Sequence, residues 1–444
     1  MKWRAHQHVV ERDQFQDHCS SYKERIALRE KELEQAAEGP DKGEKRRRLS
    51  DLRQEYDQFL EAWQQKQELA KLVPHGAITA GGPKPPEAEQ AQIRVLADGS
   101  ARLPEAVLDG LDYFIRGNAY YEIGDNEHAL AAYTRSLELA SDHPDTLNNR
   151  GVTLDHMGRH EDALKDFNRA LELRPDDPDT LNNRGAILDE LKRYEEALKD
   201  YGRALEVRPD LPATLYNRGI TFHNMGRYEE ALQDFNRALE LRPDHNDTLN
   251  NRGVTLRKLE RYEEALKDYN RALELGPDDP GTLMNRGATL DELKRYDDAL
   301  KDYNRALELR PDHLDTLYNR GLTLAKMGQH EDALKDHNRA LELRPDHPAT
   351  LHNRGLTLFK MERYEDALKD IDRALELEPS DADALFIRAC AYSMMGRFQE
   401  CLLDLENAIK RHERVREWAK TDEDFENLRN DPEYGPRFRA LVGE

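Results

Sequence analysis

The sequence predicts an all-α protein in which similar pairs of helices are stacked one after another. The tripeptide Asn-Arg-Gly recurs every 34 residues through the middle of the chain, and between recurrences the apolar and small residues follow helical spacing. Charged residues make up 35% of the chain, which suits exposed amphipathic helices better than one large globule. The glycines of the tripeptide are Gly151, Gly185, Gly219, Gly253, Gly287, Gly321 and Gly355.

Nine repeat units are expected over residues 110–415. Gly117 extends the series towards the N-terminus and Ala389 extends it towards the C-terminus, each with an arginine before it. Each unit contains two segments of about 13 residues with helical periodicity. Asp177 and Pro178 are typical of an N-cap followed by the first helical residue, and Pro209 is typical of a helix end.

The repeat resembles the tetratricopeptide repeat family, whose helix-turn-helix unit also has 34 residues. With the glycine counted as position 8, position 20 is Ala in eight units, position 27 is Ala in eight, and position 32 is Pro in seven. The resemblance implies a right-handed α-solenoid, the superhelix of this family, in which the first helix of each unit lines a concave groove.

Three segments flank or precede the repeats. Residues 1–73 read as a coiled-coil-like hairpin, with helices over 3–38 and 43–73 separated by Gly39-Pro40-Asp41-Lys42-Gly43. Residues 74–109 have the composition of a Gly/Pro-rich linker and lead-in, with a small β-hairpin expected around Asp98-Gly99. Residues 416–444 are expected to form capping helices on the last unit.

Composition restricts the partners. The formal net charge of -22 disfavours nucleic acid. The three cysteines, Cys19, Cys390 and Cys401, lack the spacing of a disulfide framework or a zinc site. No uncharged apolar run is long enough for a membrane span or an export signal. We therefore expect a cytoplasmic protein with neither nucleic acid nor membrane as a partner.

No catalytic or cofactor motif is recognisable in the sequence. Walker, GxGxxG, HExxH and GxSxG patterns are missing. His156 and His160 are four residues apart, but Gly158 places a turn between them, so we expect no metal ligation. Arginines at position 7 recur in phase with aspartates at position 23, which favours ion pairs within the scaffold over phosphate binding. We expect a protein that is not an enzyme and that needs no cofactor.

A row of asparagines at position 6 is the main candidate binding feature. In the family this position borders the concave face, and one amide can pair with both the N–H and the C=O of an extended peptide. The row resembles the asparagine ladder of the tetratricopeptide domain of O-linked N-acetylglucosamine transferase. Alternatively, the amides bond to neighbouring helices or to water. The row consists of Asn149, Asn183, Asn217, Asn251, Asn285, Asn319 and Asn353.

Neighbouring positions vary and would supply specificity. Position 5 carries Tyr216 and Tyr318, and positions 12 and 13 alternate in sign, with Arg257 and Lys258 as a basic pair. We expect a scaffold or adaptor that binds an extended peptide segment of another protein, with the hairpin (residues 3–73) mediating a homodimer or docking to a second protein. The alternative is a ligand- or peptide-responsive regulatory subunit of a bacterial-type signalling or enzyme assembly whose active site is on another chain.

Overall fold

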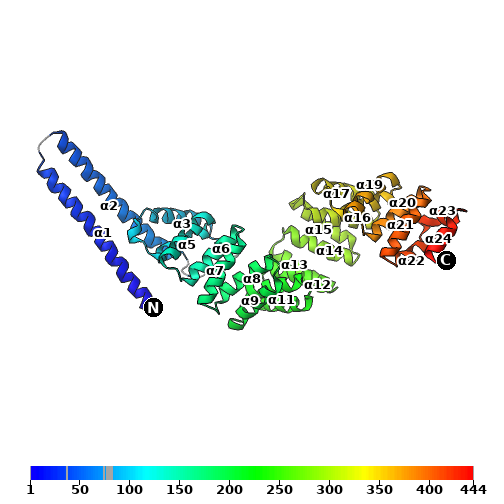
Figure 1. Cartoon of the computed structure of the whole chain (residues 1–444), viewed down its shortest axis with the longest axis horizontal. Helices are drawn as coiled ribbons and strands as arrows, with labels where there is room; N and C mark the ends of the chain where they lie inside the picture. The colour runs from blue at the N-terminus through cyan, green and yellow to red at the C-terminus, as the bar shows by residue number, and fades with distance from the viewer. Residues whose placement is uncertain (1, 37–38, 74–75, 77–83, 444) are drawn as a thin grey trace. The chain divides into compact units, whose positions relative to one another are not determined.

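The computed structural model describes residues 2–36, 39–73, 76 and 84–443, with side chains described from residue 15 onward (Figure 1). The chain divides into two compact units, residues 1–225 and residues 226–444. The all-α prediction is confirmed, since the described residues form helices and no strand.

The first unit holds a helical hairpin, a short connecting helix and the first repeats. Its elements are α1 (Lys2–Glu34), α2 (Pro40–Leu72), α3 (Glu87–Ser100), η1 (Glu105–Val107), α4 (Gly110–Glu122), α5 (Asn126–Leu139), α6 (Pro144–His156), α7 (His160–Leu173), α8 (Pro178–Glu190), α9 (Tyr194–Val207) and α10 (Pro212–Asn224).

The second unit holds the remaining repeats and the C-terminal helices. Its elements are α11 (Tyr228–Leu241), α12 (Asn246–Lys258), α13 (Tyr262–Leu275), α14 (Pro280–Glu292), α15 (Tyr296–Leu309), α16 (Leu314–Lys326), α17 (His330–Leu343), α18 (Pro348–Lys360), α19 (Tyr364–Leu377), α20 (Ala382–Met394), α21 (Phe398–Arg411), α22 (Val415–Thr421), η2 (Glu423–Phe425), α23 (Glu426–Asn430) and α24 (Gly435–Val442).

Residues at the unit corners fix where each first helix begins. Asp177 accepts a hydrogen bond from the backbone N–H of Thr180 at 2.9 Å, and Pro178 is the first residue of α8. At two of these corners, His143 and His245 take the place of the aspartate and accept from the N–H three residues on. These histidines therefore cap helices.

Close contact between the two helices of a unit requires the glycine at position 8. A Cβ added to Gly253 would lie 2.6 Å from Cε1 of Tyr269, whose ring is fully buried. The same approach of ring and glycine is found between Gly151 and Phe167 at 2.7 Å. The aromatic side chain at position 24 thus packs directly on the backbone of the first helix.

Arginines at position 7 join the helices of a unit to each other and to the unit before. Arg286 donates from Nε and Nη2 to both carboxylate oxygens of Asp302, at 2.7 and 2.6 Å, and from Nη1 to Asn270 of the preceding unit at 2.7 Å. Arg320 and Arg354 repeat this arrangement. The predicted ladder of scaffold ion pairs is confirmed, and its bidentate geometry explains why arginine occupies the position.

The N-terminal hairpin packs against the first repeat. In Figure 1, α1 and α2 lie side by side and run antiparallel. Phe59 and Trp63 of α2 are buried in one cluster with Leu103, Val107 and Tyr113. The second helix begins at Pro40, three residues earlier than predicted, because proline is well tolerated at the first helical position.

The segment expected to be a linker contains a helix. The β-hairpin expected around Asp98-Gly99 is wrong, because residues 87–100 form α3, with Ile93 and Ala97 buried against neighbouring helices. Tertiary burial outweighs the turn preference of Asp-Gly here. Residues 74, 75 and 77–83 of the Gly/Pro-rich stretch lie outside the described residues.

Short helices cover the apolar end of the last repeat. Phe425, Leu428 and Phe438 are fully buried in the cluster of the ninth unit, and Asp422 accepts from the N–H of Asp424 at 3.0 Å. The last of these helices, α24, begins at Gly435. None of the helices in the described ranges combines the length and apolar character that a bilayer span requires.

We predict opposite effects for two alanine substitutions of helical glycines. Gly253→Ala forces a methyl group against the Tyr269 ring and should destabilise the protein by about 1–3 kcal/mol. Gly202→Ala, in the interior of α9, places its Cβ in open space and should stabilise it by about 0.5–1 kcal/mol. Urea unfolding followed by circular dichroism measures both, and equal shifts of the two midpoints would contradict the contact.

We predict that His337→Phe stabilises the protein and reduces its sensitivity to acid. His337 is fully buried, neither ring nitrogen has a hydrogen-bond partner in the described structure, and its burial, with the Arg354 charge, lowers its pKa to about 4. An unfolded chain binds this proton near pH 6.5, so the stability present above pH 6.5 is lost as the pH falls towards 4. In thermal unfolding at pH 7 and pH 5, the variant should lose less stability than the parent; equal losses would contradict this assignment.

Candidate functional site

The asparagines at position 6 fall into two groups according to what their amides bind. In the first group, the amide donates to an asparagine at position 5 of the preceding unit. This is one of the two readings that the sequence left open, and it holds for this group. The pairs are Asn183 to Asn148 at 3.0 Å, Asn217 to Asn182 at 3.2 Å and Asn285 to Asn250 at 3.1 Å.

Asn149 is also bonded internally, although to Asn118 at position 9 of the first unit and not to a position 5 residue, and it is covered by the chain itself. Its side chain is fully buried, and Nδ2 donates to Oδ1 of Asn118 at 2.9 Å and to the carbonyl of Gly76 at 3.1 Å. Its Oδ1 accepts from Asn148 at 3.0 Å. The N-terminal end of the row is therefore used by residues that precede the repeats.

In the second group, the acceptor at position 5 is missing. Met284 and Tyr318 stand where Asn319 and Asn353 would need an amide oxygen. The side-chain amides of Asn319 and Asn353 are half-buried and make no hydrogen bond within the part of the chain that the structure describes. For Asn251, position 5 of the preceding unit is Tyr216. Asn251 donates instead to the backbone carbonyl of Asp247 in its own helix, at 3.0 Å.

A hollow of about 370 Å³ lies beside the last of these amides. Asn353, Tyr318 and Glu378 are among its lining residues. The ring of Tyr318 meets the ring of His347 edge-on, with centroids 6.0 Å apart. This hollow brings two of the predicted site residues, Tyr318 and Asn353, to one place in the second unit.

The other predicted specificity residues lie elsewhere. Arg257 is half-buried near Tyr269; burial raises the pKa of Tyr269 to about 12, and the Arg257 charge acts in the opposite direction. Lys258 is exposed at the end of α12, and Tyr216 is half-buried on α10 of the first unit. These three residues do not line the hollow.

Some of the alternating charges at positions 12 and 13 form ion pairs between neighbouring units. Lys326 pairs with Asp291 of the preceding unit, and Thr323 donates to the same carboxylate at 2.7 Å. The charge at these positions therefore joins one unit to the next as well as facing outward.

Two clusters within the described ranges bring potential metal ligands together. In the first, Nδ1 of His160 lies 2.9 Å from Asp155 and 3.8 Å from Glu190, so the histidine is already hydrogen-bonded to a neighbouring carboxylate. His156 stacks on Tyr121 instead of facing His160. In the second, Cys390 lies near Asp422 and Asp424, but burial raises the pKa of the thiol well above its usual range, which disfavours the thiolate that a metal needs.

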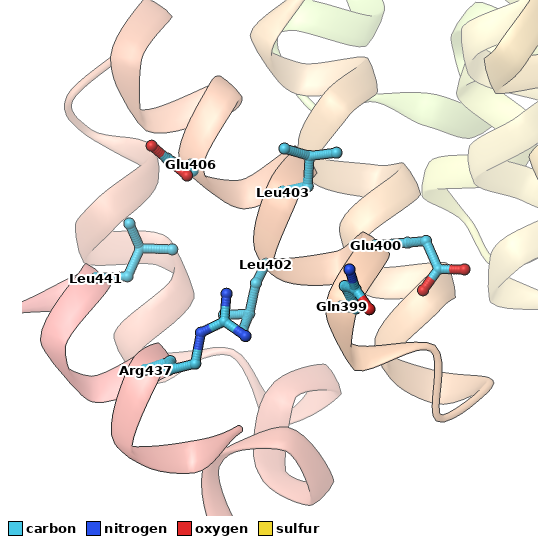
Figure 2. Close-up of a pocket in the computed structure, with 7 residues that line it drawn as sticks. All are labelled: Gln399, Glu400, Leu402, Leu403, Glu406, Arg437 and Leu441. Atoms are coloured by element: carbon cyan, nitrogen blue, oxygen red, sulfur yellow. The ribbon is translucent and has the colours of Figure 1, made fainter. Parts of the chain in front are cut away.

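A second hollow, of about 560 Å³, lies between α21 and α24 (Figure 2). Leu402 and Leu403 of α21 and Leu441 of α24 supply its apolar surface, and Arg437 extends from α24 towards α21. It is formed by the second helix of the last unit and the capping helices, and it contains none of the position 6 amides.

The sequence interpretation did not identify position 5 as the hydrogen-bond acceptor for the position 6 amide of the next unit. The signal was present as a joint pattern, because an asparagine at position 5 in one unit followed by one at position 6 in the next supplies an acceptor and a donor. The two positions have to be considered together, across the boundary between units, to separate the bonded amides from the unbonded ones.

Comparison with known proteins concerns the repeats. A family model described as tetratricopeptide repeat matches residues 111–176, 142–210, 176–244, 210–278, 244–312, 278–346 and 312–380, and a second model with the same description matches residues 352–412. Comparison with curated proteins gives no match.

Several solved structures of similar proteins match part of the chain. YrrB, described as a TPR protein with an unusual peptide-binding site, is 31% identical over 42% of this chain and 96% of its own, with a TM-score of 0.36. A tetratricopeptide repeat protein from Parabacteroides merdae is 20% identical over 55% and 97%, with a TM-score of 0.47. PilF of Pseudomonas aeruginosa is 22% identical over 46% and 93%, with a TM-score of 0.43.

We predict that two asparagine-to-alanine substitutions differ in their cost. Asn148→Ala removes the acceptor of Asn183 inside a buried network and should destabilise the protein by about 1–3 kcal/mol. Asn353→Ala removes a half-buried amide that bonds to no described residue and should change stability by less than about 0.5 kcal/mol. Denaturant unfolding of the two variants checks this, and comparable losses would contradict the division into two groups.

Proposed function

Because the chain belongs to the tetratricopeptide repeat family, whose members bind other proteins, we propose that it is a non-enzymatic scaffold that binds an extended segment of another protein along its first helices. The second unit supplies the part of the amide row that engages the segment. The proposal rests on one observation: the side-chain amides of Asn319 and Asn353 have no hydrogen-bond partner among the described residues, and Asn353 lines the hollow at Tyr318.

An unpaired amide on a half-buried surface is suited to binding backbone. Each asparagine side chain offers an acceptor and two donors, so it can bond to the C=O and the N–H of an extended peptide whatever side chains the peptide carries. Stacked helix layers are about 8–10 Å apart, which matches two to three residues of extended chain at about 3.3 Å each. Two consecutive amides, one layer apart, therefore suit a segment of about three to four residues.

The internally bonded amides have a different role in this proposal. Asn183, Asn217 and Asn285 hold neighbouring first helices together through the position 5 asparagines. Their bonds supply the rigid frame on which the unpaired amides are displayed. Substituting them would change frame and site together, so they are poor probes of binding.

The hairpin acts in this proposal as a cap on the first repeat. Its aromatic residues Phe59 and Trp63 are already buried against Val107 and Tyr113. A homodimer through residues 3–73 stays a prediction, and it would have to use the outer face of the hairpin.

We predict that the double substitution Asn319→Ala and Asn353→Ala weakens peptide capture at least about tenfold, the equivalent of 1.4 kcal/mol, while the unfolding transition is unchanged. The measurement is retention of a random decapeptide library on the immobilised full chain. A matched control is Asn304→Ala, because Asn304 lies on a second helix and accepts from Arg320. If the double variant retains the same peptides with the same affinity as the parent, the proposed function is wrong.

A further inference from the structure

In the second and third units, an ion pair joins the residue after the second helix to the first turn of the first helix. We call this part of a unit its corner. Arg174, at position 31, donates from Nη1 to Oδ1 of Asp145, at position 2 of the same unit, at 2.6 Å. Arg208 does the same to Asp179 at 2.9 Å. Position 31 is arginine in five of the nine units. The arginine side chain thus reaches across the corner, and the aspartate of the same unit pairs with it.

The eighth unit lacks both members of this pair. Its position 2 is Ala349 and its position 31 is Glu378, so the acid becomes a methyl group and the cation becomes a carboxylate. The carboxylate of Glu378 is exposed and has no ion pair or hydrogen bond among the described residues. The hollow of about 370 Å³ lies at this corner, with Ala349 and Glu378 in its lining.

The other acid of the hollow, Asp381, has contacts at both carboxylate oxygens. Asp381 accepts at one oxygen from the N–H groups of Asp383 and Ala384, at 2.9 and 3.0 Å, and its other oxygen lies 3.3 Å from Nδ1 of His352. Glu378 is therefore the acid of the hollow whose carboxylate contacts no hydrogen-bond donor or basic side chain among the described residues.

The lining of the hollow suits a planar cation. The rings of Tyr318 and His347 supply aromatic surface, and Glu378 supplies an acceptor for a guanidinium group. Arginine fits this combination better than lysine, because its planar group stacks on rings and bonds to a carboxylate through two N–H groups. Residues 1–73 carry 15 basic and 15 acidic residues, so the net charge of -22 lies in residues 74–444 and attracts basic segments.

We propose that the corner of the eighth unit binds an arginine side chain of the partner segment, which takes the place that the protein's own arginine fills in other units. This inference rests on the proposed function, since Asn353 in the same hollow would hold the backbone of that segment. It adds the chemical class of the residue that is recognised.

One experiment uses single residues and does not depend on peptide capture. N-acetylarginine amide and its neutral isostere N-acetylcitrulline amide are titrated into the full chain and followed by saturation-transfer NMR. We expect binding of the arginine compound about tenfold tighter than that of the citrulline compound. The preference should disappear in Glu378→Arg, which installs the residue found in other units. It should survive in the control Glu365→Arg, which makes the same charge change at an exposed position of α19.

A second experiment uses decapeptide libraries with arginine or citrulline at one fixed position. We expect about tenfold greater retention of the arginine library, and loss of that difference in the double variant Ala349→Asp and Glu378→Arg, which rebuilds the internal ion pair. Equal retention of both libraries would overturn the arginine site and leave the proposed function standing. Arginine selectivity of the single residues without any peptide capture would support the site and overturn the proposed function. No binding in either experiment would overturn both.

Discussion

The architecture depends on the approach of an aromatic ring to a glycine backbone within each helix pair. Because Gly253 has no side chain, the ring of Tyr269 packs directly on the first helix, and the alanines at positions 20 and 27 keep the surrounding contacts equally close. This contact sets the distance between the two helices of a unit. The distance in turn brings each arginine at position 7 within reach of its aspartate and of the preceding unit.

Polar groups in such a stack serve two purposes, and the residues beside them decide which. An asparagine at position 6 holds neighbouring units together when the preceding unit offers an amide at position 5, as Asn250 does for Asn285. It is left for a partner when that position is Met284 or Tyr318. The same holds for the corner of the helix pair, where Arg174 and Asp145 close the space that Ala349 and Glu378 leave open. Departures from the repeat pattern therefore mark the binding surface better than the pattern itself.

Both departures lie in the same part of the chain. The unpaired amides of Asn319 and Asn353, the aromatic pair of Tyr318 and His347 and the uncompensated Glu378 all belong to the seventh and eighth repeats. At the other end of the row, Asn149 is buried and bonded to Asn118 and Gly76. A nearly uniform scaffold can thus confine recognition to a few units by changing four or five side chains, because each unit contacts only its neighbours.

Periodicity by itself determined the helix pairs, their boundaries and the ion pairs of the scaffold, since these recur along the repeats and depend on contacts close in sequence. The segment around Asp98-Gly99 was misread as a turn because its burial against α2 and α4 comes from tertiary packing. Only the tertiary structure showed that Asn285 donates to Asn250, 35 residues away; the paired positions are visible in the sequence, but the contact between them is not. The hollow at Glu378 likewise depends on side chains from α16, α18 and the loop before α20, which local sequence patterns do not bring together.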